Sequence, residues 1–392
     1  MIDTEKEYWF AFEPYIHITL KEKAALLYNT LDGEYIKATD EDELKFIAAL
    51  LDKKNCGVTK VTAKEWQCDA IRNLLTTARD KFFADLYECS LSEQKPIQFY
   101  PILNLQEEVG RLQNFSSGYV GTKMFTYLYK ITVDIEELEG EALCALMDEV
   151  WEQVRSGSLK HLCIIIYTAS QLQTLRTWLE NHEEATGCVE WMMKAELAFN
   201  DRHGINEPAT IIMNAEDIPA GNLPHAGNSS VSWIFRVHTE DELETVSSLI
   251  DRYELQHYKI EPVYDNTNLP FFEEQVFLEK EDIFSKPVSM QEIMRNQVLN
   301  THKFGKLFVS SNGDVRAGSV LEAPIGNLHA ENIRRLVHKE MTEGKSWLHI
   351  RNQKPCCDCI YQWLCPSPSD YESVIGSPYG IFARGNHSIR NR

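Results

Sequence analysis

The sequence predicts an α/β protein built in three parts, and three observations carry this prediction. The first ninety residues order as three strands followed by helices, a winged-helix-like pattern. From Lys95-Pro96 onward, strands alternate with helical segments. After Phe304, a hairpin pattern leads to four cysteines within ten residues. We therefore expect domains at 1–92, 95–300 and 301–376, with a disordered tail at 377–392.

The N-terminal part is predicted from alternating apolar residues and turn signals. Its expected strands are Pro14–Leu20, Glu22–Thr30 and Glu34–Ala38. Asp32-Gly33 is a typical hairpin turn between the last two strands. Asp40 and Glu43 have capping-box spacing and predict a helix start. A second helical region is expected over Ala63–Leu86.

The middle part is predicted from apolar runs separated by helical segments of roughly 10–15 residues. The expected strands are Ile97–Leu103, Tyr127–Ile135, His161–Tyr167, Ala209–Asn214, Val231–His238 and Gln256–Tyr264. Between the second and third of these runs, Glu141–Arg155 shows apolar residues at helical spacing. Repeated strand–helix units of this kind predict a parallel sheet or a partial barrel.

The composition limits the classes of partner and the cellular compartment that we expect. The formal net charge of −20 argues against nucleic acids and anionic membranes, which require clustered Lys and Arg. The polar start is no secretory signal, and the longest aliphatic run, Leu162–Tyr167, is too short to span a bilayer. Ten cysteines in a long chain without such a signal indicate reduced thiols and a cytoplasmic protein.

The C-terminal motifs carry a family resemblance. In order they are Gly305-x-Leu307-x-Val309, Asn312-Gly313-Asp314-Val315, Ile325-Gly326-Asn327-Leu328 and Cys356-x2-Cys359-x5-Cys365. This series resembles the SPASM domain, a C-terminal extension of radical-SAM enzymes that holds auxiliary iron–sulfur clusters. The N-terminal part resembles the leader-peptide recognition domain of peptide maturases, and the middle part resembles the partial (β/α) radical-SAM barrel.

Two further stretches, Leu27–Gly33 and Cys365–Ser369, are similar to the pseudo-radical-SAM family of Bacteroidales peptide-modification systems. This resemblance implies a winged-helix-like leader-binding domain, a degenerate partial barrel and a SPASM-like domain. It also implies two partners, a precursor peptide whose leader ends in Gly-Gly and an active radical-SAM maturase.

The cysteines of radical-SAM chemistry are absent. That chemistry needs a Cys-x3-Cys-x2-Cys loop to hold a [4Fe–4S] cluster that binds S-adenosylmethionine. The loop after the first predicted barrel strand, Asn104–Gly118, contains no cysteine, and no two cysteines of the chain lie four positions apart. We therefore expect no core cluster, no S-adenosylmethionine and no catalytic residue of that kind, which predicts a pseudoenzyme of peptide maturation.

The metal state of the C-terminal cysteines stays open at this point. Cys356, Cys357, Cys359 and Cys365 are the candidate ligands, for an iron–sulfur cluster or for zinc. Cys357 adjoins Cys356 and would have difficulty reaching the same metal. The SPASM pattern places further cysteines where this chain has Ala317-Gly318 and Ser369. The third alternative is therefore that these cysteines bind no metal.

The third N-terminal strand is the candidate peptide-binding element. In leader-recognition domains, a peptide adds as a strand to this edge, which here contains Glu34, Tyr35, Ile36 and Lys37. The acidic surface would favour a Lys-rich leader. Three alternatives remain: a purely structural edge, a SPASM-derived iron–sulfur electron-transfer module, and an enzyme with non-radical chemistry at the barrel mouth.

Overall fold

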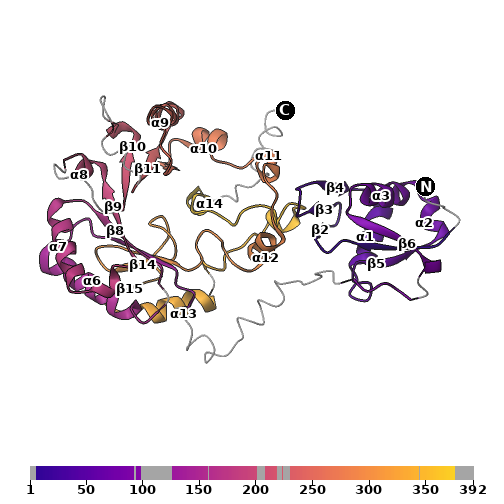
Figure 1. Ribbon diagram of the computed structural model, residues 1–392, viewed down its shortest axis with the longest axis horizontal. Helices are drawn as coiled ribbons and strands as arrows, with labels where there is room; N and C mark the ends of the chain where they lie inside the picture. The colour runs from indigo at the N-terminus through magenta and orange to yellow at the C-terminus, as the bar shows by residue number, and fades with distance from the viewer. Residues whose placement is uncertain are drawn as a thin grey trace.

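The computed structural model describes residues 6–91, 94–98, 126–157, 159–200, 208–218, 223, 230–343 and 345–375 (Figure 1). The predicted strand Ile97–Leu103 falls almost wholly outside these residues. The loop Asn104–Gly118 and the predicted tail at 377–392 also lie outside them.

The N-terminal lobe, residues 6–91, contains two three-stranded antiparallel sheets with the orders β5-β1-β6 and β2-β3-β4. Its strands are β1 (Tyr8–Phe12), β2 (Ile16–Leu20), β3 (Ala25–Asn29), β4 (Tyr35–Ala38), β5 (Val58–Val61) and β6 (Ala84–Glu88). Its helices are α1 (Glu41–Leu51), α2 (Ala63–Gln67) and α3 (Asp69–Asp80), followed by the 3-10 turn η1 (Cys89–Leu91). The two sheets and the helices share one apolar core.

The three predicted N-terminal strands and the helix after Asp40 are confirmed, including the Asp40–Glu43 capping box. The single helical region Ala63–Leu86 is wrong, because it divides into α2, α3 and β6. Helix α3 ends where Phe82 adopts a left-handed conformation with φ of 60°, and the chain then extends into β6. Strands β1 and β5 were not predicted.

The rest of the described chain forms a nine-stranded, mostly parallel sheet with the order β12-β11-β10-β9-β8-β7-β13-β14-β15. Its strands are β7 (Lys130–Asp134), β8 (His161–Ile166), β9 (Val189–Lys194), β10 (Ala209–Asn214), β11 (Val231–Val237), β12 (Tyr258–Pro262), β13 (Lys306–Val309), β14 (Asp314–Arg316) and β15 (Gly326–Asn327). Pairing is parallel from β12 to β13 and antiparallel from β13 to β15. No pairing among the described residues closes the sheet, which is open.

Helices alternate with the parallel strands and continue beyond them. They are α6 (Gly140–Val154), α7 (Ala169–Glu180), α8 (Ala195–Asn200), α9 (Glu240–Tyr253), α10 (Leu269–Gln275), α11 (Lys280–Phe284), α12 (Met290–Val298), α13 (Ile333–Glu343) and α14 (Asp370–Ile375). The face that carries Ile164, Trp191 and Trp233 packs against α6, α7 and α9 in the main core. We call the opposite face, with Ile165 and Ile212, the inner face; α14 lies on this side in Figure 1.

These findings confirm the predicted α/β class and the parallel strand–helix units. Strand β10 matches its predicted bounds, and the hairpin predicted after Phe304 is β13 and β14. Strand β9 was not predicted. Within the described ranges, none of the helices combines the length and the apolar composition that crossing a bilayer would require.

Candidate functional site

The predicted peptide-binding strand, β4, lies at one edge of the sheet β2-β3-β4. The backbone N–H of Asn29 donates to the Glu34 carbonyl oxygen, and the register pairs Leu27 with Ile36. Since hydrogen-bonded and non-bonded pairs alternate in an antiparallel ladder, the backbone groups of Ile36 point to β3. Those of Tyr35 and Lys37 point outward, and no strand of the described chain pairs with them.

The side chains of this edge divide between its two faces. Ile36 packs against the core of the N-terminal lobe, and Lys37 is exposed. The Tyr35 ring stacks on Phe284 of α11 with centroids 4.5 Å apart, and its hydroxyl lies 3.2 Å from Lys280 Nζ. Glu34 pairs with Lys81 at the end of α3, at 2.8 Å. The end of α3 therefore adjoins the start of β4.

Phe82, which the helical spacing of Ala63–Leu86 predicts to be a core residue, is instead exposed beside this edge. Phe82 follows Lys81 directly, and its side chain is 75% exposed. The backbone N–H of Phe82 donates to the Arg79 carbonyl oxygen, and the N–H of Phe83 donates to the Ala78 carbonyl oxygen. These two bonds form the Schellman motif that ends many helices. Glycine is favoured at the left-handed position of this motif, where a side chain is strained. Neither the backbone conformation nor burial of the ring therefore favours phenylalanine at this position.

The C-terminal cysteines lie in a short buried segment. Cys356, Cys359 and Cys365 are buried, whereas Cys357 is half-exposed. Burial raises the pKa of the Cys365 thiol to about 12, although the nearby Arg351 guanidinium opposes this shift. Burial therefore favours the protonated thiol of Cys365.

Two of these sulfurs have polar neighbours. Sγ of Cys359 accepts the backbone N–H of Tyr361 at 3.3 Å, and Sγ of Cys356 lies 3.6 Å from Nη1 of Arg351. Arg351 also forms a bidentate pair with Glu372 of α14, with N–O distances of 3.1 and 2.8 Å. Arg351 therefore connects the cysteine segment to α14.

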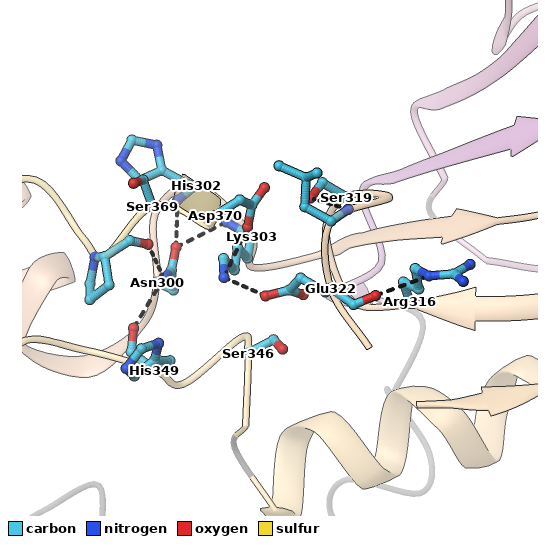
Figure 2. A network of polar contacts seen from close by, with 12 residues as sticks. Asn300, His302, Lys303, Arg316, Ser319, Glu322, Ser346, His349, Ser369 and Asp370 are labelled. Atoms are coloured by element: carbon cyan, nitrogen blue, oxygen red, sulfur yellow. Dashed lines mark hydrogen bonds and ion pairs between the residues drawn. The ribbon is translucent and has the colours of Figure 1, made fainter. Parts of the chain in front are cut away.

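Two of the places at which the SPASM pattern would have further cysteines adjoin a buried ion-pair network (Figure 2). Lys303 is 2% exposed at its side chain and contacts both Glu322 and Asp370. Gly318 lies against this network, since a Cβ there would come within 3.5 Å of Lys303 and Glu322 atoms. Ser369 directly precedes Asp370. Burial alone would lower the pKa of Lys303, but the bond to Glu322 and the charge of Asp370 raise it.

The donor set is therefore incomplete for a cluster. Within the residues that the structure describes, no three His, Cys, Asp or Glu side chains are grouped so that they could hold a metal ion. The two places at which the SPASM pattern has further cysteines hold Ala317-Gly318 and Ser369 in this chain. In this arrangement the residues present do not fit a four-thiolate site.

The two candidate regions are in contact. Leu26 and Tyr28, on one face of the β2-β3-β4 sheet, share an apolar cluster with Ile283, Leu364 and Cys365. Polar contacts follow the same interface: Lys21 Nζ lies 2.7 Å from Oε1 of Gln362, and the N–H of Val288 donates to the Tyr28 hydroxyl at 2.8 Å. The sheet that ends in β4 is thus packed directly against the cysteine segment.

Comparisons with known proteins do not show a family. No protein-family model matches the chain, and no curated protein matches it. Among solved structures, one likeness is to the EAL enzyme Bd1971 in its cAMP- and cyclic-di-GMP-bound form, over 74% of this chain and 95% of that chain at 13% identity. Its TM-score of 0.21 does not indicate a shared fold.

Proposed function

We propose that the protein is a non-catalytic component of a cytoplasmic system that matures ribosomally made peptides. In this proposal it is a pseudo-radical-SAM protein with a winged-helix-like leader-binding domain, a degenerate partial barrel and a SPASM-like domain. The leader of the precursor peptide adds as a strand to β4. The observation that carries the proposal is the edge itself, where the outward backbone groups of Tyr35 and Lys37 have no strand partner in the described chain.

Strand addition accounts for both affinity and selectivity. The peptide backbone would bond to the N–H and C=O groups of Tyr35 and Lys37, and alternate peptide side chains would face the two sides of the sheet. Phe82 offers an apolar contact beside the start of the strand. The net charge of −20 favours a basic leader, so affinity should fall as salt rises.

The loss of the radical-SAM cysteines gives the second half of the proposal. A chain without a Cys-x3-Cys-x2-Cys loop leaves the radical chemistry to a partner. In this proposal the partner is an active maturase that acts on the peptide held at β4. Co-purification of the two proteins from cells that also express the precursor would test this half separately.

The leader-binding half is tested by substitutions at Lys37, whose N–H points away from the sheet. Lys37→Pro removes this donor without removing a bond of the β3–β4 ladder, because proline is tolerated on edge strands where its nitrogen faces outward. Lys37→Ala is the matched control, since it removes the charge and keeps the N–H. The assay is fluorescence anisotropy of a labelled precursor leader titrated with the full chain.

We expect Lys37→Pro to weaken leader binding by about tenfold or more, because the peptide loses at least one hydrogen bond and its strand register. Lys37→Ala should stay within about threefold of wild type, an exposed charge contributing little. Circular dichroism and thermal unfolding check that both variants fold. Equal affinities of Lys37→Pro and wild type, or no saturable binding by wild type, would contradict the proposal.

A further inference from the structure

A second candidate binding region lies on the inner face of the parallel sheet, and its residues are distant in sequence from β4. Lys194 is the last residue of β9, and Arg236 is the second-last residue of β11. Lys194 and Ile234 both pair in register with Ile212, and Arg236 lies two residues beyond Ile234. Because side chains alternate along a strand, Lys194 and Arg236 share this face in adjacent layers.

The Lys194 and Arg236 side chains both have hydrogen-bond donors for which the described residues provide no acceptor. Arg236 uses Nε to bind Oε2 of Glu261 at 3.2 Å, and none of the described residues accepts a hydrogen bond from its two Nη atoms. Lys194 Nζ lies over the Tyr167 ring, 5.1 Å from the centroid. Within the described chain it makes no hydrogen bond or ion pair. Two half-buried cations on one face of the sheet therefore carry donors that no described residue accepts.

Burial and like charge both act against a charged Lys194 at this position. Burial lowers the pKa of Lys194, and the positive charge of Arg236 lowers it further, against the opposing effect of Asp134, Glu136 and Glu196. An anion between the two groups would relieve both the repulsion and the loss of hydration. Both groups also lie towards the carboxyl ends of parallel strands, which is the end of a parallel α/β sheet at which ligands bind.

The surroundings select among anions. Tyr167 donates its hydroxyl to Oδ1 of Asp134 at 3.0 Å, so that a carboxylate flanks Lys194 on the β7 side. Glu261 flanks Arg236 on the β12 side and is also bound by Lys259 at 2.8 Å. Since carboxylates lie on both sides, a dianion would meet more repulsion than a monoanion.

We propose that Lys194 and Arg236 bind the carboxylate group of a small molecule or peptide at the carboxyl ends of β9 and β11. Arg236 would supply two parallel N–H donors and Lys194 a point charge, the complementary roles that these two side chains take at oxyanions. The proposal concerns a ligand of the parallel sheet and stands apart from leader binding at β4.

The test measures the thermal midpoint of the full chain in N-acetylglycine, phosphate and chloride at equal ionic strength. Binding to the native state raises the midpoint with ligand concentration. We expect N-acetylglycine to raise the wild-type midpoint by a few degrees above chloride, and phosphate to raise it less. Lys194→Met should abolish this difference while keeping or raising the midpoint in chloride, because a half-buried like charge is removed. Lys194→Arg should retain the effect.

Lys259→Met is the matched control, since Lys259 lies on the same face but is 63% exposed and already paired with Glu261. It should keep the carboxylate effect. Three results would overturn the proposal: a wild-type midpoint no higher in N-acetylglycine than in chloride, a Lys194→Met variant that keeps the effect, or phosphate acting more strongly than the carboxylate. Loss of the effect in Lys259→Met would equally count against it.

Discussion

The hydroxyl oxygen of Tyr28 accepts the backbone N–H of Val288 at 2.8 Å, across 260 residues of sequence. Tyr28 lies on β3, the central strand of the sheet whose edge is β4. Val288 lies between α11 and α12, in the segment that packs beside the cysteines. This bond and the apolar cluster around it hold the N-terminal lobe against the C-terminal part of the chain.

Tyr28→Phe removes the hydroxyl and leaves the ring in place. We expect a loss of about 1–2 kcal/mol in the free energy of unfolding, because the Val288 N–H loses its acceptor in a partly buried interface. Urea unfolding measures the loss, and limited proteolysis should show earlier release of the N-terminal lobe. Tyr258→Phe, at a side chain 48% exposed, is the control and should change neither. An unchanged unfolding midpoint for Tyr28→Phe would show that the bond to Val288 does not stabilise the protein.

The same interface should be sensitive to acid through His17. His17 pairs with Tyr28 across β2 and β3, and so shares its face of the sheet. Burial lowers the pKa of His17 to about 4, whereas an unfolded His titrates near ~6.5. Between these values the unfolded chain binds more protons, so stability falls as the pH falls through this window.

From pH 7.5 to pH 5.5, the His17 contribution to the free energy of unfolding should fall by about 1 kcal/mol. Denaturant unfolding of wild type and His17→Gln at the two pH values measures it. The free energy of unfolding of wild type minus that of His17→Gln should fall by about this amount at the lower pH, because the glutamine does not titrate. A constant difference would show that His17 is not held neutral by the interface.

The sequence predicted local features well and long-range contacts poorly. Strand β10 was predicted with its bounds, because Ala209–Asn214 is a short apolar run between polar segments. Helix α3 was extended through β6, because the apolar residues of 63–86 keep a helical spacing past the left-handed Phe82. Strand β9 carries few β-branched residues, and its neighbours β8 and β10 stabilise it.

The candidate sites divide in the same way. The edge position of β4 follows from a local hairpin, so Glu34–Lys37 could be found from turn and strand signals. The contact of Tyr28 with Val288 and the convergence of Lys194 with Arg236 depend on how distant segments pack. No spacing in the sequence encodes either of them. The cysteine motif can be found in the sequence as a set of ligand types. The ion pairs of Lys303 join positions that are distant in the sequence, so they become visible only in the fold.

Lys303 is the member of that network whose loss should be most damaging. Lys303→Met leaves Glu322 and Asp370 near one another without a buried counter-charge, and we expect a loss of about 3–5 kcal/mol. Glu322→Gln added to Lys303→Met should restore part of it, because one uncompensated carboxylate is removed. Thermal and denaturant unfolding of the two variants measure this. A double variant less stable than Lys303→Met would contradict the assignment of the ion pair.

The same geometry predicts the metal content of the protein. Since no three potential ligands of the described residues are grouped to hold a metal ion, the buried thiols should hold neither a full iron–sulfur cluster nor zinc at one ion per chain. Iron and zinc analysis of anaerobically purified protein, with its visible spectrum, checks this. A stable [4Fe–4S] spectrum that is lost in Cys359→Ser would mean that the cysteine segment rearranges around a metal.

Phe82 offers a substitution that should affect binding without weakening the fold of the N-terminal lobe. Phe82→Gly places the favoured residue at the left-handed position after α3, so the free energy of unfolding should stay equal or rise by up to about 1 kcal/mol. The exposed ring is lost, so leader affinity should fall several-fold. Phe82→Tyr keeps the ring and serves as the control, with affinity near that of wild type. If the glycine variant binds the leader as tightly as wild type, Phe82 is not part of the peptide site. If it unfolds more easily, the ring stabilises the lobe after all.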